Sequence, residues 1–220
     1  MFRSNRLKYT NLPPAQRIRK LAAECMEPDL NALGFQLLKS DITFKRKKEG
    51  FSQEIHFSLN NRNSGSSMVD FWLILSVRSS FYAKWHLDTY HQEAMNDSIN
   101  SWDSINHTEL ETRYSKLGHY DLTRHDNVKL MASIREMLMQ GGIELLDRSS
   151  DWQGAADQLM EEKKYGAVAK IFDFHVLSGN IERAADSLQF IEDHYRKLDQ
   201  IPEKRFEEIR IRRAYLQSLI

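Results

Sequence analysis

The spacing of apolar residues changes along this chain, and that change limits the folds open to it. Between residues 42 and 90, apolar and polar residues largely alternate, which is the period of a half-buried β-strand. From residue 126 onward, apolar residues recur three and four positions apart, which places them on one side of an α-helix. A run of strands followed by a run of helices predicts an α+β protein.

Four strands are expected in the first half. Residues 42–46 and 51–59 alternate on either side of a short polar connection that contains a glycine, as in a β-hairpin. Residues 69–78 are apolar at nearly every position, which is typical of a central strand covered on both faces. Residues 81–90 alternate again and are expected to form the fourth strand. The polar stretch 91–124 has no clear pattern, and we assign no element to it.

A helix is expected before the sheet. Pro13 and Pro14 suit a helix start, and Pro28 is expected to kink the helix or restart it. Gly34 suits the left-handed residue that ends a helix. The apolar residues between them keep the spacing of a core-facing stripe, and they are Ile18, Leu21, Ala22, Cys25 and Met26.

About five helices in antiparallel hairpins are expected in the second half. Asp126 and Asn180 suit N-caps, Gly141 and Gly142 suit the end of the first of these helices, and Pro202 suits the start of the last one. We therefore expect an N-terminal helix packed on a four-stranded, mainly antiparallel sheet in a domain over residues 1–124. A helical region over residues 125–220 follows, and it could pack on the sheet as one unit.

Charge and composition argue against several classes of protein. The 220 residues include 31 Lys and Arg and 31 Asp and Glu, so no overall field attracts nucleic acid or an anionic membrane. The basic residues are nevertheless concentrated before residue 49. No apolar run approaches the roughly 20 residues of a membrane helix, and the start has no hydrophobic signal core, so we expect a cytoplasmic protein. The single cysteine, Cys25, excludes a disulfide within the chain.

Four consecutive basic residues stand at the hairpin turn. They are expected to form the solvated end of a strand, where lysines also discourage pairing with another sheet edge. The alternative is an anion-binding or partner-binding site. The residues are Lys45, Arg46, Lys47 and Lys48.

No motif of catalysis, metal binding or cofactor binding stands out. The two densest histidine clusters, residues 86–91 and 119–126, lack a spacing with a known mechanism. We therefore expect no metal and no cofactor, and we assign no catalytic residue. An enzyme of unrecognised type remains the alternative, and it would require a deep pocket with converging titratable side chains, placed on the polar face of the sheet.

The polar face of the predicted sheet is the candidate partner-binding surface. Tyrosine, tryptophan and arginine among polar groups resemble the composition of a recognition surface. Exposure of Trp72 and Arg78 would support this hypothesis, and burial of both would remove the surface. If the strands are neighbours, the face presents Glu54, His56, Asp70, Trp72, Arg78, Tyr82, Lys84 and His86.

The segment 14–90 resembles a bacterial family of domains of unknown function. The resemblance consists of a helix ending in Leu-Gly-Phe, a Phe-x-Arg strand and a meander, and it rests on Gly34, Phe35, Phe44, Lys45 and Arg46. It implies a role as an immunity protein against toxins of neighbouring bacteria, although members of that family have no settled activity. The helical second half departs from the family's compact pattern.

These observations favour a non-catalytic protein that binds another protein through the sheet face or a helical groove. The identity of that partner and the oligomeric state are not contained in the sequence. Nucleic-acid binding through the basic N-terminal part is a further alternative, and the neutral net charge argues against it.

Overall fold

The computed structural model describes residues 7–65, 67–94, 96–115, 118–198 and 203–219. It confirms the α+β class. The chain divides into two compact units: unit 1 is formed by Met1–Arg78 with Ser101–Leu146, and unit 2 by Ser79–Asn100 with Asp147–Ile220. These units are groups of residues in mutual contact, so the division into a domain over residues 1–124 and a helical region over residues 125–220 stays a prediction. No described helix is long and apolar enough to cross a membrane.

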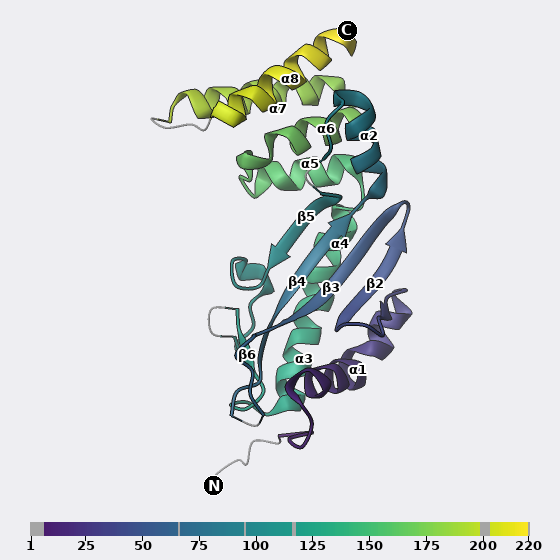
Figure 1. Ribbon diagram of the computed structural model, residues 1–220, viewed down its shortest axis with the longest axis vertical. Coiled ribbons are helices and arrows are strands. Elements are labelled where there is room, and N and C mark those ends of the chain that lie inside the picture. Colours follow the sequence, from purple (N-terminus) through teal and green to yellow (C-terminus); the bar gives the residue numbers. More distant parts are fainter. Residues whose placement is uncertain (1–6, 66, 95, 116–117, 199–202, 220) are drawn as a thin grey trace. The chain divides into compact units, whose positions relative to one another are not determined.

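An antiparallel sheet forms the centre of unit 1 (Figure 1). Its order is β1-β2-β3-β4-β5, and β6 also pairs with β4. In the register of the central pair, Ile55 lies opposite Leu75 and Phe57 opposite Leu73. The described strands are β1 (Gln36–Leu37), β2 (Thr43–Lys48), β3 (Phe51–Leu59), β4 (Asp70–Arg78), β5 (Ser98–Asp103) and β6 (Tyr120–Asp121).

The core of unit 1 lies on one face of this sheet. The rings of Phe57 and Phe71 stack with centroids 5.6 Å apart, and Phe44 and Tyr120 extend the aromatic row on either side. In Figure 1, helices α3 (Asn127–Met137) and α4 (Ile143–Arg148) lie against one face of the strands. Their side is the apolar one, because Gln53 Nε2, on the buried face of β3, donates to the Leu146 carbonyl at 3.1 Å.

The N-terminal helix α1 (Pro14–Ala32) packs against α3. Arg17 fixes this contact, since its buried guanidinium donates to the Leu122 carbonyl and to Asn127 Oδ1. Pro28 lies inside the helix without ending it, whereas Gly34 follows it with φ +85°, in the left-handed conformation predicted for a helix end.

Two predictions about local structure were wrong. Residues 81–90 form helix α2 (Ser80–Tyr90), not a fourth strand. Tyr82 and His86, four residues apart, are buried on one helical face, and the same residues also satisfy an alternation of two. The helix that begins after Asp126 does not end at Gly141 and Gly142, because a wider π-helical turn over Leu138–Gly142 carries it on into α4.

Unit 2 is helical. Beside α2 it contains α5 (Trp152–Glu161), α6 (Val168–Leu177), α7 (Ile181–Arg196) and α8 (Glu203–Leu219), and consecutive helices of this series pack against one another. The Asn180 side chain caps α7 by accepting from the Arg183 amide, as predicted. The predicted start at Pro202 lies outside the described residues.

Gly154 is required for steric reasons at the start of α5. A Cβ atom there would lie 2.4 Å from the Arg148 carbonyl oxygen. We expect Gly154→Ala to lower the free energy of unfolding by about 1–3 kcal/mol, because backbone must move to relieve the overlap.

Urea unfolding followed by circular dichroism measures this loss. Gly141→Ala is the control, since nothing lies within 4 Å of its added Cβ. It should leave stability unchanged or raise it by up to about 1 kcal/mol. Equal unfolding midpoints for the two variants would contradict the steric argument.

Candidate functional site

The polar face of the sheet in unit 1 holds five of the eight residues predicted to form a partner-binding surface. Four of them, Glu54, His56, Trp72 and Arg78, share one face of β3 and β4 by the strand register. Glu54 lies at the centre of a row of charges: Lys45 Nζ is 2.7 Å from Glu54 Oε1, and Arg78 Nε is 3.6 Å from Glu54 Oε2.

Trp72 is half-buried. It is therefore neither exposed, which would have supported a binding surface, nor fully buried, which would have argued against one. Its ring meets the edge of the His119 ring at a centroid distance of 5.3 Å. Asp70, the fifth residue, is buried at the start of β4 and accepts from His119 Nδ1 at 3.0 Å. His56 bonds the Thr43 hydroxyl at 2.8 Å. These polar groups therefore bond mainly to one another.

The other three predicted residues, Tyr82, Lys84 and His86, do not belong to this face. They lie on α2 in unit 2, because residues 81–90 are helical. The eight residues therefore do not form one surface of adjacent strands.

The four basic residues of the hairpin alternate between the two faces of the sheet. Lys45 and Lys47 lie on the polar face and Arg46 and Lys48 on the opposite one. Arg46 is held by the protein itself, since its guanidinium lies 4.4 Å from the centroid of the Phe35 ring and Nε donates to Gln53 Oε1 at 2.6 Å. An anion site formed by all four residues stays a prediction.

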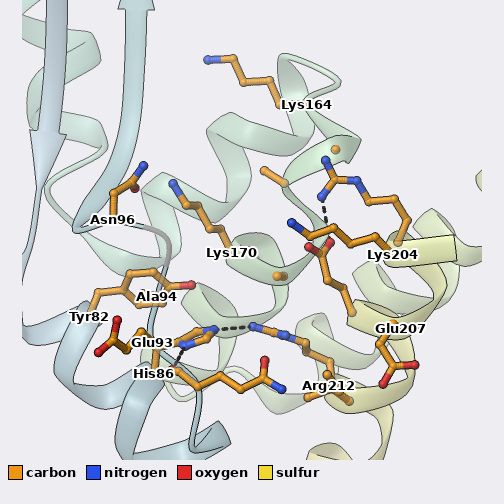
Figure 2. Close-up of a pocket in the computed structure, with 17 residues that line it drawn as sticks. Tyr82, His86, Glu93, Ala94, Asn96, Lys164, Lys170, Lys204, Glu207 and Arg212 are labelled. Carbon is orange, nitrogen blue, oxygen red and sulfur yellow. Dashed lines mark hydrogen bonds and ion pairs between the residues drawn. The ribbon is translucent and has the colours of Figure 1, made fainter. Parts of the chain in front are cut away.

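A cavity with a volume of about 720 Å³ lies within unit 2 (Figure 2). Its walls come from α2, from Gln92, Glu93, Ala94 and Asn96 after that helix, from the turn over Tyr165–Ala167, and from α6 and α8. Residues separated by more than 100 positions thus face one cavity, which no local sequence pattern could reveal.

A buried ion pair lies at one wall of this cavity, which Arg212 lines and Asp173 does not. Asp173 on α6 has no exposed surface, and Arg212 on α8 is 2 % exposed. Arg212 Nη2 lies 2.9 Å from Asp173 Oδ2 and Nε lies 3.2 Å from Oδ1. This two-point contact is the geometry in which an arginine binds a carboxylate best, and it joins α6 to α8.

Two tyrosines of α2 complete the shell around Asp173. Tyr82 donates its hydroxyl to Oδ2 at 2.9 Å and Tyr90 donates to Oδ1 at 2.7 Å. Burial, together with the Asp173 carboxylate, raises the pKa of both tyrosines well above the ordinary value. Burial alone would lower the pKa of Arg212, but Asp173 raises it above its ordinary value. The network therefore keeps one negative and one positive charge and two neutral phenols.

His86 links the network to the chain that follows α2. Its Nδ1 lies 3.0 Å from the Gln92 carbonyl, which can only accept, so Nδ1 carries the hydrogen. Nε2 then has a free lone pair and accepts from Arg212 Nη2 at 3.0 Å (Figure 2). This pattern requires the neutral imidazole.

The hydrogen-bonding capacity of this network is used within the protein. Each Asp173 oxygen accepts two bonds, and both nitrogens of His86 are engaged. Such groups hold α2, α6 and α8 together and have no proton or lone pair left for a substrate. Sequence reasoning missed Asp173 and Arg212, although one signal existed: an acid between Phe172 and Phe174 in the most apolar helix needs a buried partner.

His175, on the same helix, is buried. Burial lowers its pKa below the ordinary value, Asp157 acts in the opposite direction, and Arg183 lowers it further. The unfolded chain therefore takes up a proton as pH falls below about 6.5, before the folded chain does. The contribution of neutral His175 to the free energy of unfolding is fully present above that pH. It is lost as the pH decreases toward the pKa of His175 in the folded protein.

We expect His175→Gln to flatten this decrease. Urea midpoints at pH 7, 6 and 5 should fall less steeply for the variant than for the wild type, and measurements at pH 8 separate this effect from any loss of packing. Parallel curves for the two proteins would contradict the assignment.

Known proteins give no further guidance to the site. No protein-family model, no curated protein and no solved structure matches the chain. The resemblance of residues 14–90 to a bacterial domain family stays a prediction. Among the described residues, no group of three or more His, Cys, Asp or Glu side chains is placed to hold a metal ion.

Proposed function

We propose that this protein binds a small molecule in the cavity of unit 2. The observation that carries the proposal is the cavity itself: its volume of about 720 Å³ falls in the range of about 300–1,000 Å³ typical of small-molecule sites.

The hydrogen bonds of Arg212 and His86 support the proposal, because they hold this wall of the cavity in place before a ligand binds. Arg212 and His86 line the cavity, and each is fixed by partners on another element. A wall that does not have to be ordered on binding reduces the entropic cost of association.

The same network favours binding over catalysis. A general acid or base must be able to exchange a proton with its substrate, whereas Asp173 and His86 bond to Arg212, Tyr82 and Tyr90 or to the backbone. We therefore rank an enzyme below a binding protein.

Fluorescence titration with N-phenyl-1-naphthylamine and 8-anilinonaphthalene-1-sulfonate tests the proposal. These dyes share one ring skeleton and brighten in apolar pockets. At least one of them should bind with a stoichiometry of one. Ala169→Phe places a ring in the cavity that Ala169 lines and should weaken binding at least about tenfold, which corresponds to 1.4 kcal/mol.

Ala214→Phe is the matched control, because Ala214 is exposed on α8 and does not line the cavity. It should bind as the wild type does, and thermal unfolding verifies that both variants are folded. Failure of both dyes to bind the wild type, or equal binding by Ala169→Phe, would refute the proposal.

Binding of a protein partner by the polar face of the sheet is the second candidate. The observation that favours it is that α3 and α4 lie on the other face, and no described helix of unit 1 covers this one (Figure 1). Lys47 is exposed on this face near Lys45 and Arg78. The positive charge of these residues would favour a partner that presents an acidic segment. A cytoplasmic location and the immunity role implied by the resemblance belong to this candidate.

Trp72→Ala tests it. A protein that co-purifies with the tagged wild type in equal amount should be lost from the variant, provided that the variant unfolds at a similar temperature. A partner retained in full by Trp72→Ala would place the interface elsewhere.

A further inference from the structure

Lys170 is a cation of the cavity of unit 2 that has no described carboxylate beside it. Lys170 lines the cavity from α6, and its ammonium donates to the Ser98 carbonyl at 2.6 Å. Within the part of the chain that the structure describes, no carboxylate oxygen lies within 4.0 Å of this ammonium. A carbonyl occupies only one of its three donors.

The neighbouring cations are arranged differently. Arg212 pairs with Asp173, and Arg205 pairs with Glu208 at 2.8 Å. Lys164 Nζ lies 2.7 Å from Glu162. These three positive charges have carboxylate partners supplied by the protein, whereas Lys170 has none within 4.0 Å among the described residues. An anion beside Lys170 would therefore supply a counter-charge that the described part of the protein does not.

The surroundings of Lys170 also penalise its charge. Burial, with a smaller contribution from Lys164, lowers its pKa below the ordinary value, although Asp97 acts in the opposite direction. An anion placed beside the ammonium would oppose both effects. Figure 2 shows the Lys170 side chain with its ammonium directed to the Asn96 side of the cavity, whereas the carboxylate of Glu207 points away from it.

The rest of the lining suits an apolar body. Ala167 and Ala169 line the cavity near Lys170, and Ile211 contributes from α8. Apolar surface of this kind gains free energy when a ring or alkyl group displaces water from it. The cavity thus places a cation without a described carboxylate partner beside apolar surface.

We propose that the ligand of unit 2 is a small organic anion, with its carboxylate, sulfonate or phosphate group held by Lys170 and its apolar part against the alanine and isoleucine walls. This inference rests on the proposed function and adds the chemical class of the ligand. It assigns to Lys170 the role of the anion-binding residue.

The two dyes test the inference, because they differ only by the sulfonate. The wild type should bind 8-anilinonaphthalene-1-sulfonate more tightly than N-phenyl-1-naphthylamine. Lys170→Met should weaken binding of the sulfonate at least about tenfold, as expected for losing a hydrogen bond to a charged group, and should leave binding of the neutral dye unchanged. Lys170→Arg should retain most of the sulfonate affinity.

Lys84→Met is the matched control, since Lys84 is an exposed lysine of the same unit that does not line the cavity. It should change neither affinity. Equal losses for both dyes in Lys170→Met, or no loss for the sulfonate, would overturn the role of Lys170 while leaving the cavity as a binding site. Failure of both dyes to bind the wild type would refute the proposed function itself.

Discussion

Replacing Arg212 by methionine is expected to lower the free energy of unfolding by about 3–5 kcal/mol, the usual cost of leaving one charge of a buried pair without its partner. Asp173 has no exposed surface, and without the guanidinium its carboxylate keeps only the hydroxyls of Tyr82 and Tyr90 as described partners. Methionine keeps much of the side-chain volume, which limits the loss to charge and hydrogen bonds. Urea unfolding followed by circular dichroism measures the change.

A double-variant cycle isolates the ion pair from other effects. Asp173→Asn should also destabilise unit 2, because it leaves Arg212 buried without a carboxylate. Combining Arg212→Met with Asp173→Asn should cost clearly less than the sum of the two single variants, since no isolated charge remains. Each single variant should lose more free energy of unfolding than the roughly 1 kcal/mol typical of an exposed ion pair. A smaller loss, or a loss in the double variant equal to the sum of the two single losses, would contradict the described network.

Phe57→Ala is expected to have a comparable effect on unit 1, with a loss of about 3–5 kcal/mol. Phe57 is 1 % exposed and stacks between Phe71 and Phe44 on the apolar face of the sheet. Removing its ring leaves a cavity bounded by paired strands, which have little freedom to collapse into it.

Phe190→Ala is the comparison, because Phe190 is 51 % exposed on α7. It should change stability by less than about 1 kcal/mol. Losses of similar size for the two variants, measured by urea unfolding, would show that Phe57 is not in a packed core.

Elements with a local signature could be predicted from the sequence. The alternation over residues 51–59 predicted β3, because a strand covered on one face repeats its apolar residues every second position. The nearly continuous apolar run over residues 69–78 predicted β4, because such a run is typical of a central strand. Asp126 and Asn180 predicted two helix starts, since each accepts from amides two or three residues later.

Elements defined by distant contacts could not be predicted in this way. Residues 81–90 fit both a strand and a helix, and the contacts that Tyr82 and Tyr90 make with Asp173 decide for the helix. Strand β6 has two residues and exists only because Tyr120 and Asp121 pair with β4. Its sequence carries no period of its own.

The candidate site shows the same division. Tyr82 and His86 were selected from the sequence for their chemistry, but their surroundings were assigned to the wrong element. No sequence pattern marks Lys170 as a binding residue. Its proposed role depends on the contact with Ser98, on the charge of Lys164 and on the cavity that it lines. Such relations arise only when the helices pack.

Chemical-shift mapping by nuclear magnetic resonance tests the central claim most directly, namely that the cavity of unit 2 holds a small organic anion. The isotopically labelled full chain would be titrated with 8-anilinonaphthalene-1-sulfonate. We predict saturable shifts confined to residues around the cavity, with the amides of Ala167, Ala169 and Lys170 among the largest. Shifts centred on the sheet of unit 1, or no saturable shifts around the cavity, would contradict this claim.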